Sequence, residues 1–139
     1  MDITTQALIA FASHLRFEDL NAKALEAAKA RILSTIAVSL AAYELEPVRI
    51  ARKLAQPVAS GPSARIFGSL ANTTPDMAAF VNSAMVRNLD MSDSYVISAV
   101  SHPADALPAI LAVAEAENLS GRDFLLALAI IYEVQCRFV

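Results

Sequence analysis

Glycine is scarce and alanine is abundant in this chain of 139 residues, and this contrast limits the fold more than any other feature of the sequence. The three glycines are Gly61, Gly68 and Gly121. Alanine has the highest helix propensity and is depleted in strands, so the chain favours helices over sheets. The length suits one domain with a core and is too short for two. We therefore expect a single domain over residues 1–139, folded as an all-α bundle of about six helices.

Capping residues and apolar spacing divide the chain into the expected helices. The second, from Ala22 to about Glu44, is apolar nearly all round between residues 32 and 43, which predicts that it is buried on most sides. Residues 60–71 are expected to form at most a short extended piece, over Ala64–Phe67. The predicted starts are Thr4 or Thr5, Asn21, Glu46 with Pro47, Thr74 with Pro75, His102 with Pro103, and Ser120 with Asp123. The third helix is expected to reach Val58 and the fourth about Leu89, and Pro108 is a candidate kink in the fifth.

Hydropathy and charge exclude several classes of protein. Hydrophobic residues make up 56% of the chain and the mean hydropathy is +0.48, yet the longest clean apolar run, Phe124–Tyr132, is well short of the ~18 residues that span a bilayer. The first residues lack the basic and apolar regions of a secretory signal, so we expect a cytoplasmic protein. A single cysteine excludes an internal disulfide, and a net charge of −3 without a basic patch predicts no nucleic-acid partner. The last helical pattern reaches Val139 without a stop signal, as expected if more protein followed.

Polar residues are concentrated between Asn88 and Pro103, in a chain that is otherwise apolar. If the preceding helix continues by one turn, Asp90, Asp93 and Ser94 share one of its faces, and His102 follows across a short loop. The simplest interpretation is a solvated connection, because serine and aspartate are common in caps and turns. A functional site is the alternative.

Two details favour the site. Tyr95, Val96, Ile97 and Val100 make the segment too apolar for a freely solvated connector, so its polar residues are expected to face the body of the protein. His102 stands at the N-cap of a helix, where the dipole disfavours imidazolium and leaves a neutral ring that can act as a base. The free N–H groups of that helix end could hold a substrate carboxylate, in competition with Asp105.

Other candidates are weaker. His14 reads as an ordinary boundary residue and Cys136 as a buried, inert thiol. Tyr132 and Glu133 interrupt an apolar helix, which suits a function, a satisfied buried acid or an interface equally. Asn82 is a candidate cross-link between helices. Arg87 could pair with Asp90 or with an anionic substrate; no histidine pair suggests a metal site, and no glycine loop suggests phosphate binding.

The order of these features resembles the N-terminal helical part of the MmgE/PrpD family of dehydratases, decarboxylases and epimerases. The resemblance covers nearly the whole chain, and its specificity lies in the order of its pieces. They are Thr5–Leu20, Ala28–Leu33, Ala64–Gly68, Pro75–Asn82, Leu89–Ser94, His102 with Pro103, Leu119–Asp123 and Tyr132–Val134. The family's acidic motif typically reads Leu-Asp-aromatic-Asp-Asp-Thr, followed by His-Pro, and it maps onto Asp90, Asp93, Ser94 and His102.

The resemblance implies acid–base chemistry without cofactor or metal on a small polycarboxylate, such as 2-methylcitrate or cis-aconitate. His102 would transfer the proton, Asp90 would orient it or the substrate, and Ser94 would donate a hydrogen bond. Asp93 and Arg87 are expected to bind the substrate, Arg87 on the basis of this sequence alone. Ser92 stands where the family has an acid and lowers the negative charge, whereas Ser34 replaces an aspartate in the second helix, where packing is at stake.

Family members are longer and carry an α/β domain that completes the site. We therefore expect this chain to be incomplete relative to the family, and to act as a homo-oligomer or with a partner chain that supplies the missing domain. Three hypotheses stay open: part of a lyase, a non-catalytic oligomeric helical module derived from one, and an unrelated bundle that binds a small ligand.

Overall fold

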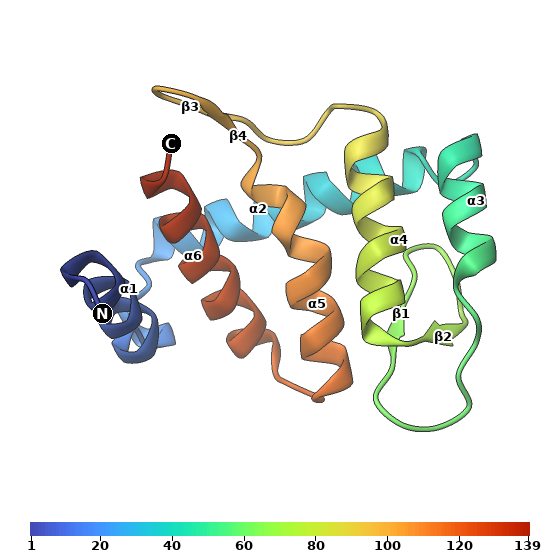
Figure 1. Ribbon diagram of the computed structural model, residues 1–139, viewed down its shortest axis with the longest axis horizontal. Helices are drawn as coiled ribbons and strands as arrows, with labels where there is room; N and C mark the ends of the chain where they lie inside the picture. Colours follow the sequence, from blue (N-terminus) through green and yellow to red (C-terminus); the bar gives the residue numbers. More distant parts are fainter.

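Six α-helices make up most of the computed structural model, which describes residues 1–139 (Figure 1). The helices are α1 (Ile3–His14), α2 (Ala22–Ala41), α3 (Glu46–Leu54), α4 (Pro75–Asn88), α5 (Leu107–Ala116) and α6 (Gly121–Arg137). Two 3-10 turns are η1 (Phe17–Asp19) and η2 (Pro103–Ala106). Four strands of two residues each form the antiparallel pairs β1 (Ala64–Arg65) with β2 (Asn72–Thr73) and β3 (Tyr95–Val96) with β4 (Val100–Ser101). The predicted all-α architecture is confirmed. None of the helices combines the length and hydrophobicity that a membrane crossing requires.

Helix α4 lies at the centre of the packing. It contacts α5, α3 and α2, while α2 crosses behind the row formed by α4, α5 and α6 (Figure 1). The larger core cluster joins the end of α2 to α3 and α4, and Val48, Val81 and Met85 are completely buried in it. A smaller cluster of alanines, with Ala78 and Ala112 at its centre, lets α4 and α5 approach closely. The core therefore surrounds α4. The C-terminal end of this helix is a fixed starting point for the loop that follows.

Most helix starts are where the capping signals place them. The Asn21 side chain accepts a hydrogen bond from the Ala24 N–H at 2.9 Å, and Ser120 forms a capping box with Asp123. The first helix differs, because Asp2 is its cap and accepts from the N–H of Thr5. An aspartate two residues before the threonines reaches the free N–H groups first, so the helix begins earlier than predicted.

The ends of the third and fifth helices also differ from prediction. Helix α3 ends at Leu54 and does not reach Val58. The chain after His102 starts with the 3-10 turn η2, and α5 begins only at Leu107. Pro108 therefore stands in the first turn of α5, where its missing N–H costs no intrahelical bond and no kink results.

Helix α2 is buried on one side only, which contradicts the prediction that it is buried on most sides. Its buried residues are Thr35 and Ser39, followed by Ala42 after its end. The Ser39 hydroxyl is satisfied within the helix, because it donates to the Thr35 carbonyl at 2.7 Å. Ile32 and Ile36, near the same stripe, are half-buried. Leu33 and Leu40 on the other sides are 72% and 46% exposed.

Gly68 allows the segment after β1 to pass close to the end of α2. Its φ of +76° lies in the left-handed region, which favours glycine. A Cβ atom at this position would lie 3.1 Å from two ring carbons of Tyr43. The predicted extended piece is confirmed at Ala64–Arg65, and Gly68 turns the chain back from it towards β2.

Asn82 fastens that segment to α4. Its amide oxygen accepts from the Phe67 N–H and its amide nitrogen donates to the Arg65 carbonyl, both at 2.9 Å. The Asn82 side chain is 2% exposed. Water therefore cannot take its place as the hydrogen-bond partner of these two backbone groups. Asn82 thus links a helix to an extended segment, and does not cross-link two helices as predicted.

Replacement of Asn82 by alanine should lower the free energy of unfolding by about 2 kcal/mol, because two backbone groups lose their partners in a buried place. Urea unfolding followed by circular dichroism measures the change. Asn88→Ala at the end of the same helix is the control, since the Asn88 side chain makes no hydrogen bond. Equal losses in the two variants would contradict this explanation.

Candidate active site

The loop that carries the site begins where α4 ends. The helix ends at Asn88, and Asp90 has a φ of 51°, a left-handed conformation that stops further helical turns. The extra helical turn considered for residues 90–94 therefore does not form, and Asp90, Asp93 and Ser94 share no helical face. The loop and the β3–β4 hairpin bring them towards η2 by another route.

Asp93 connects three separate elements. Its Oδ1 accepts from the Ala104 N–H in η2 at 3.0 Å, and its Oδ2 accepts from the Tyr132 hydroxyl on α6 at 2.8 Å. Its backbone carbonyl lies 2.7 Å from Nδ1 of His102. Asp93, predicted to bind substrate, thus has both carboxylate oxygens in hydrogen bonds within the protein.

His102 is held in one orientation by this carbonyl. A carbonyl oxygen only accepts hydrogen bonds, so Nδ1 carries a proton and donates it to Asp93. In a neutral ring with the proton on Nδ1, Nε2 carries no proton and can accept one, as a general base must. Ser94 Oγ lies 3.3 Å from the same Nδ1. The structure thus brings together Asp93, Ser94 and His102 as the sequence suggests.

The backbone N–H groups after His102 are already in use. The Ala104 N–H donates to Asp93 and the Asp105 N–H donates to the His102 carbonyl. The expectation that these groups hold a substrate carboxylate is therefore wrong for both. An aspartate from the preceding loop occupies the place, and Asp105, the competitor expected from the sequence, points its side chain elsewhere.

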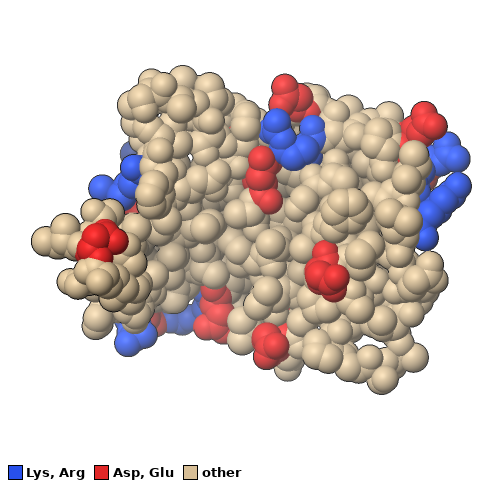
Figure 2. Space-filling model, viewed as in Figure 1, with Lys and Arg blue, Asp and Glu red and all other residues tan.

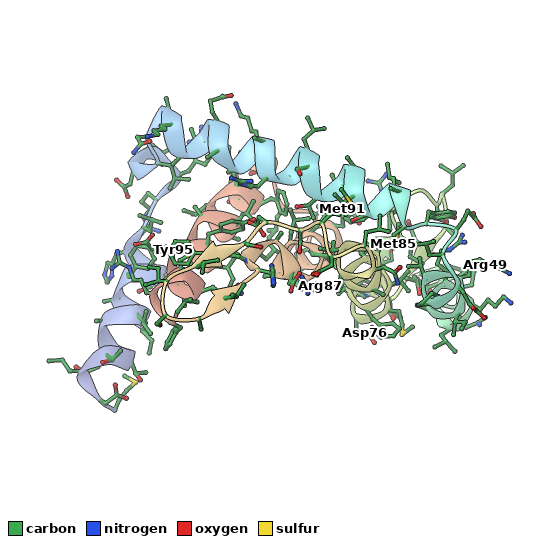
Figure 3. All side chains as sticks on the ribbon, turned by 90° about the horizontal axis from the view of Figure 1, so that it is seen from above. Arg49, Asp76, Met85, Arg87, Met91 and Tyr95 are labelled. Atoms are coloured by element: carbon green, nitrogen blue, oxygen red, sulfur yellow. The ribbon has the colours of Figure 1, made fainter.

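Arg87, on the last turn of α4, contacts a second group of polar side chains. Its guanidinium lies 3.1 Å from Asp90 and 3.6 Å from Asp105, and it donates to the Ser92 hydroxyl at 2.9 Å. Ser92 thus occupies the place where an acid would add another ion pair. Figure 3 shows Arg87 at the start of the loop and Tyr95 at its other end. The charge of Arg87, a predicted substrate ligand, is balanced by two carboxylates.

The β3–β4 hairpin turns its polar residues towards α6. Gln135 donates to the Ser101 hydroxyl at 2.8 Å, and the Ser98 hydroxyl donates to the Val139 carbonyl at 2.6 Å. The expectation that the polar residues face the body of the protein is confirmed for Ser101 and Asp93. The aliphatic residues of the hairpin face outward instead, with Val96 64% and Val100 61% exposed.

The remaining candidates lie apart from this group. His14 is exposed on α1, with Nδ1 2.7 Å from the Ala10 carbonyl, and Glu133 pairs with Arg137. Cys136 is half-buried, and burial raises the pKa of its thiol, which suits the predicted inert role. Charged side chains are few on the face seen in Figure 2. The spacing of residues did not reveal that Tyr132 belongs to the site. Its signals in the sequence were the interruption of an apolar helix and its place in the family pattern.

The structure has two hollows of about 580 and 540 Å³, and His102 lines neither of them. The first is lined by residues of β1, α5 and the start of α6, among them Arg65 and Glu115. The second lies between α1, α2 and α6, is lined mainly by apolar side chains, and includes Tyr132. Neither includes Ser94 or Asp90.

Burial favours the protonated form of Asp105. It raises the pKa of this carboxyl above its ordinary value of 3.8, and the nearby Arg87 guanidinium only partly opposes the effect. One oxygen, Oδ1, is buried without a hydrogen-bond partner. The folded chain therefore holds the Asp105 proton more tightly than the unfolded chain does. This stabilisation is complete below 3.8 and is lost as the pH rises through the raised pKa.

Asp105→Asn should remove that loss, because asparagine stays neutral at every pH. We expect the unfolding free energy of the variant to improve relative to the original chain as the pH rises from about 4 to about 7. Urea titrations at several pH values measure the difference. Asp90→Asn, at the exposed carboxylate on the same arginine, is the control and should show no such gain. A variant that weakens with rising pH would contradict the assignment.

Comparison with known proteins shows which family the chain belongs to. The family model of the MmgE/PrpD N-terminal domain matches residues 6–139. Cis-aconitate decarboxylase of Homo sapiens is 30% identical over 131 residues, which cover 90% of this chain and 27% of the human protein. The chain thus spans about a quarter of the length of this relative. The matched range spans the segment that carries the site, and the chain belongs to the MmgE/PrpD family.

Proposed function

We propose that the chain contributes part of the active site of a lyase, a dehydratase or a decarboxylase, which acts on a small polycarboxylate such as cis-aconitate or 2-methylcitrate. The observation that carries the proposal is His102, whose Nδ1 proton is bound by the Asp93 carbonyl while Nε2 is free to exchange a proton. The name of the human relative supports the substrate class. The chemistry needs neither a metal nor an organic cofactor, because a positioned base suffices for proton transfer beside a carboxylate.

Each polar residue has a role in this proposal. His102 removes a proton next to a substrate carboxylate, or protonates the carbanion that remains after carbon dioxide leaves. Ser94, beside the ring, donates a hydrogen bond to the substrate, and Asp90 orients substrate or base from the exposed end of the loop. Arg87 and Asp93, with their partners in the protein, shape the site; Arg87 keeps Asp90 in place.

The charges near His102 indicate what else is needed. Asp90 and Asp105 both pair with Arg87, and the carboxylate of Asp93 adds a third negative charge near Asp105, so the group repels a polycarboxylate unless more cations approach it. We infer that a second domain or a partner chain supplies them, with this chain in a cytoplasmic homo-oligomer or hetero-complex. The share of the human relative that has no counterpart here is long enough for such a domain.

A non-catalytic oligomeric module is the second candidate. The observation that favours it is the exposed apolar side of α2, with Leu33 and Leu40, which fits a protein partner better than water. Light scattering and activity measurements separate the two candidates. An oligomer without turnover in any combination of chains favours the module.

His102→Asn should lower turnover by roughly 100- to 10,000-fold, the usual contribution of a general acid or base. The assay follows cis-aconitate and 2-methylcitrate with the chain alone. It is repeated with a chimera in which residues 6–139 replace the matching segment of human cis-aconitate decarboxylase.

The chain provides its own control for this assay, because His14 is the other histidine. His14→Asn changes an exposed ring on α1 and should leave turnover unchanged. Full activity of His102→Asn, or equal losses in the two variants, would exclude His102 as the proton-transfer group.

A further inference from the structure

We propose that Tyr132 is a positioning residue: its hydroxyl holds the Asp93 side chain and thereby keeps the proton of neutral His102 on Nδ1. The inference rests on the proposed function, since the placement of this proton matters to catalysis only if His102 transfers protons there. The Tyr132 hydroxyl makes no hydrogen bond to His102. It acts through Asp93, from an element on the other side of the loop.

The first step is that side chains, and not backbone pairing, hold the loop. Residues 91–94 make no backbone–backbone hydrogen bond, either within a helix or strand or in a turn. The bonds at Asp93 are the two of its carboxylate, to Ala104 and Tyr132, and the one of its carbonyl, to His102. The position of that carbonyl therefore depends on where the Asp93 side chain is fixed.

The second step is that Tyr132 stands on a rigid element. Helix α6 is capped at Ser120, and its Leu128, one turn before Tyr132, is 1% exposed. Burial raises the pKa of Tyr132, and the bond to Asp93 raises it further, so the hydroxyl stays protonated and donates. Ala104, the other partner of the carboxylate, lies in η2, the turn that directly follows His102. Tyr132 is thus the anchor that lies outside the loop and η2.

The third step is what happens without the hydroxyl. Oδ2 of Asp93 would lose its only hydrogen-bond donor in a partly buried place, and a carboxylate in that position turns towards water. Without this anchor the backbone at Asp93, which has no backbone pairs of its own, is free to shift, and its carbonyl can move away from Nδ1 of His102. The ring then loses the acceptor that selects the Nδ1–H tautomer, and Nε2 takes the proton in a larger share of molecules.

Nitrogen-15 spectra of the histidine rings test the inference in the 139-residue chain itself. At a pH where His102 is neutral, we expect Tyr132→Phe to change the ratio of its two tautomers by roughly fivefold towards Nε2–H, the effect of one lost hydrogen bond. The His14 ring, exposed on α1, is the internal reference and should not change. An unchanged His102 ratio in a folded Tyr132→Phe variant overturns the inference.

Tyr95→Phe is the matched control. This change also removes a tyrosine hydroxyl, and Tyr95 lines the same hollow as Tyr132. The Tyr95 hydroxyl makes no hydrogen bond in the protein. An equal tautomer change in this variant would show general loosening and overturn the inference. If Tyr132→Phe does not fold, Tyr132→Met replaces it, since methionine fits irregular apolar gaps and also lacks the hydroxyl.

A double-mutant cycle shows whether Tyr132 acts through Asp93. In an Asp93→Ala background, Tyr132→Phe should have no further effect on the His102 tautomers, because the group that it holds is gone. Additive effects would contradict the path. In the chimera, Tyr132→Phe should lower kcat with little change in KM, and Tyr95→Phe should change neither.

The two readouts separate failure of the inference from failure of the proposed function. A tautomer change without turnover in any form of the protein supports the link from Tyr132 to His102 and contradicts the lyase. Turnover that depends on His102 but not on the Tyr132 hydroxyl, with unchanged tautomers, supports the lyase and overturns the inference.

Discussion

The carboxylate of Asp93 is the group on which the geometry of the site depends. It joins a loop, a 3-10 turn and a helix through two hydrogen bonds, and its own carbonyl orients the histidine ring. The loop makes no backbone pairs of its own at residues 91–94, so side-chain bonds alone hold it in place. The core around α4 fixes where the loop begins, and Leu128 fixes where α6 passes it. Through its bonds to η2 and α6, Asp93 holds the loop between these two fixed points, and His102 and Ser94 are positioned with it.

Local features of the fold could be predicted from the sequence because their causes are local. Asn21 and Ser120 cap helices through bonds to N–H groups three residues away, and such bonds depend on adjacent sequence alone. The burial of α2 could not be predicted this way. Its apolar residues on all sides show that it avoids water, but which side is covered depends on where other helices pack.

The same distinction applies to the site. Asp93, Ser94 and His102 lie within one short stretch, so their grouping was predictable, although the helical turn assumed for it does not form and Asp90 pairs with Arg87 instead. Tyr132 lies 39 residues from Asp93, and no spacing rule connects two residues across such a separation. The engagement of Arg87 by Asp105 likewise depends on how η2 returns to the end of α4. Tertiary packing decides which polar groups remain free for a ligand.

The loop without backbone pairs has a consequence for how the protein opens. Segments tied by a few side-chain bonds can detach while the core keeps its structure, and such openings cost much less than global unfolding. Amide protons of residues 91–94 should therefore exchange with solvent far faster than those of α4, where Val81 and Met85 are completely buried. The site can thus come apart and reassemble many times within the lifetime of one folded molecule. Thermal stability of the domain and integrity of its chemistry are then separate quantities.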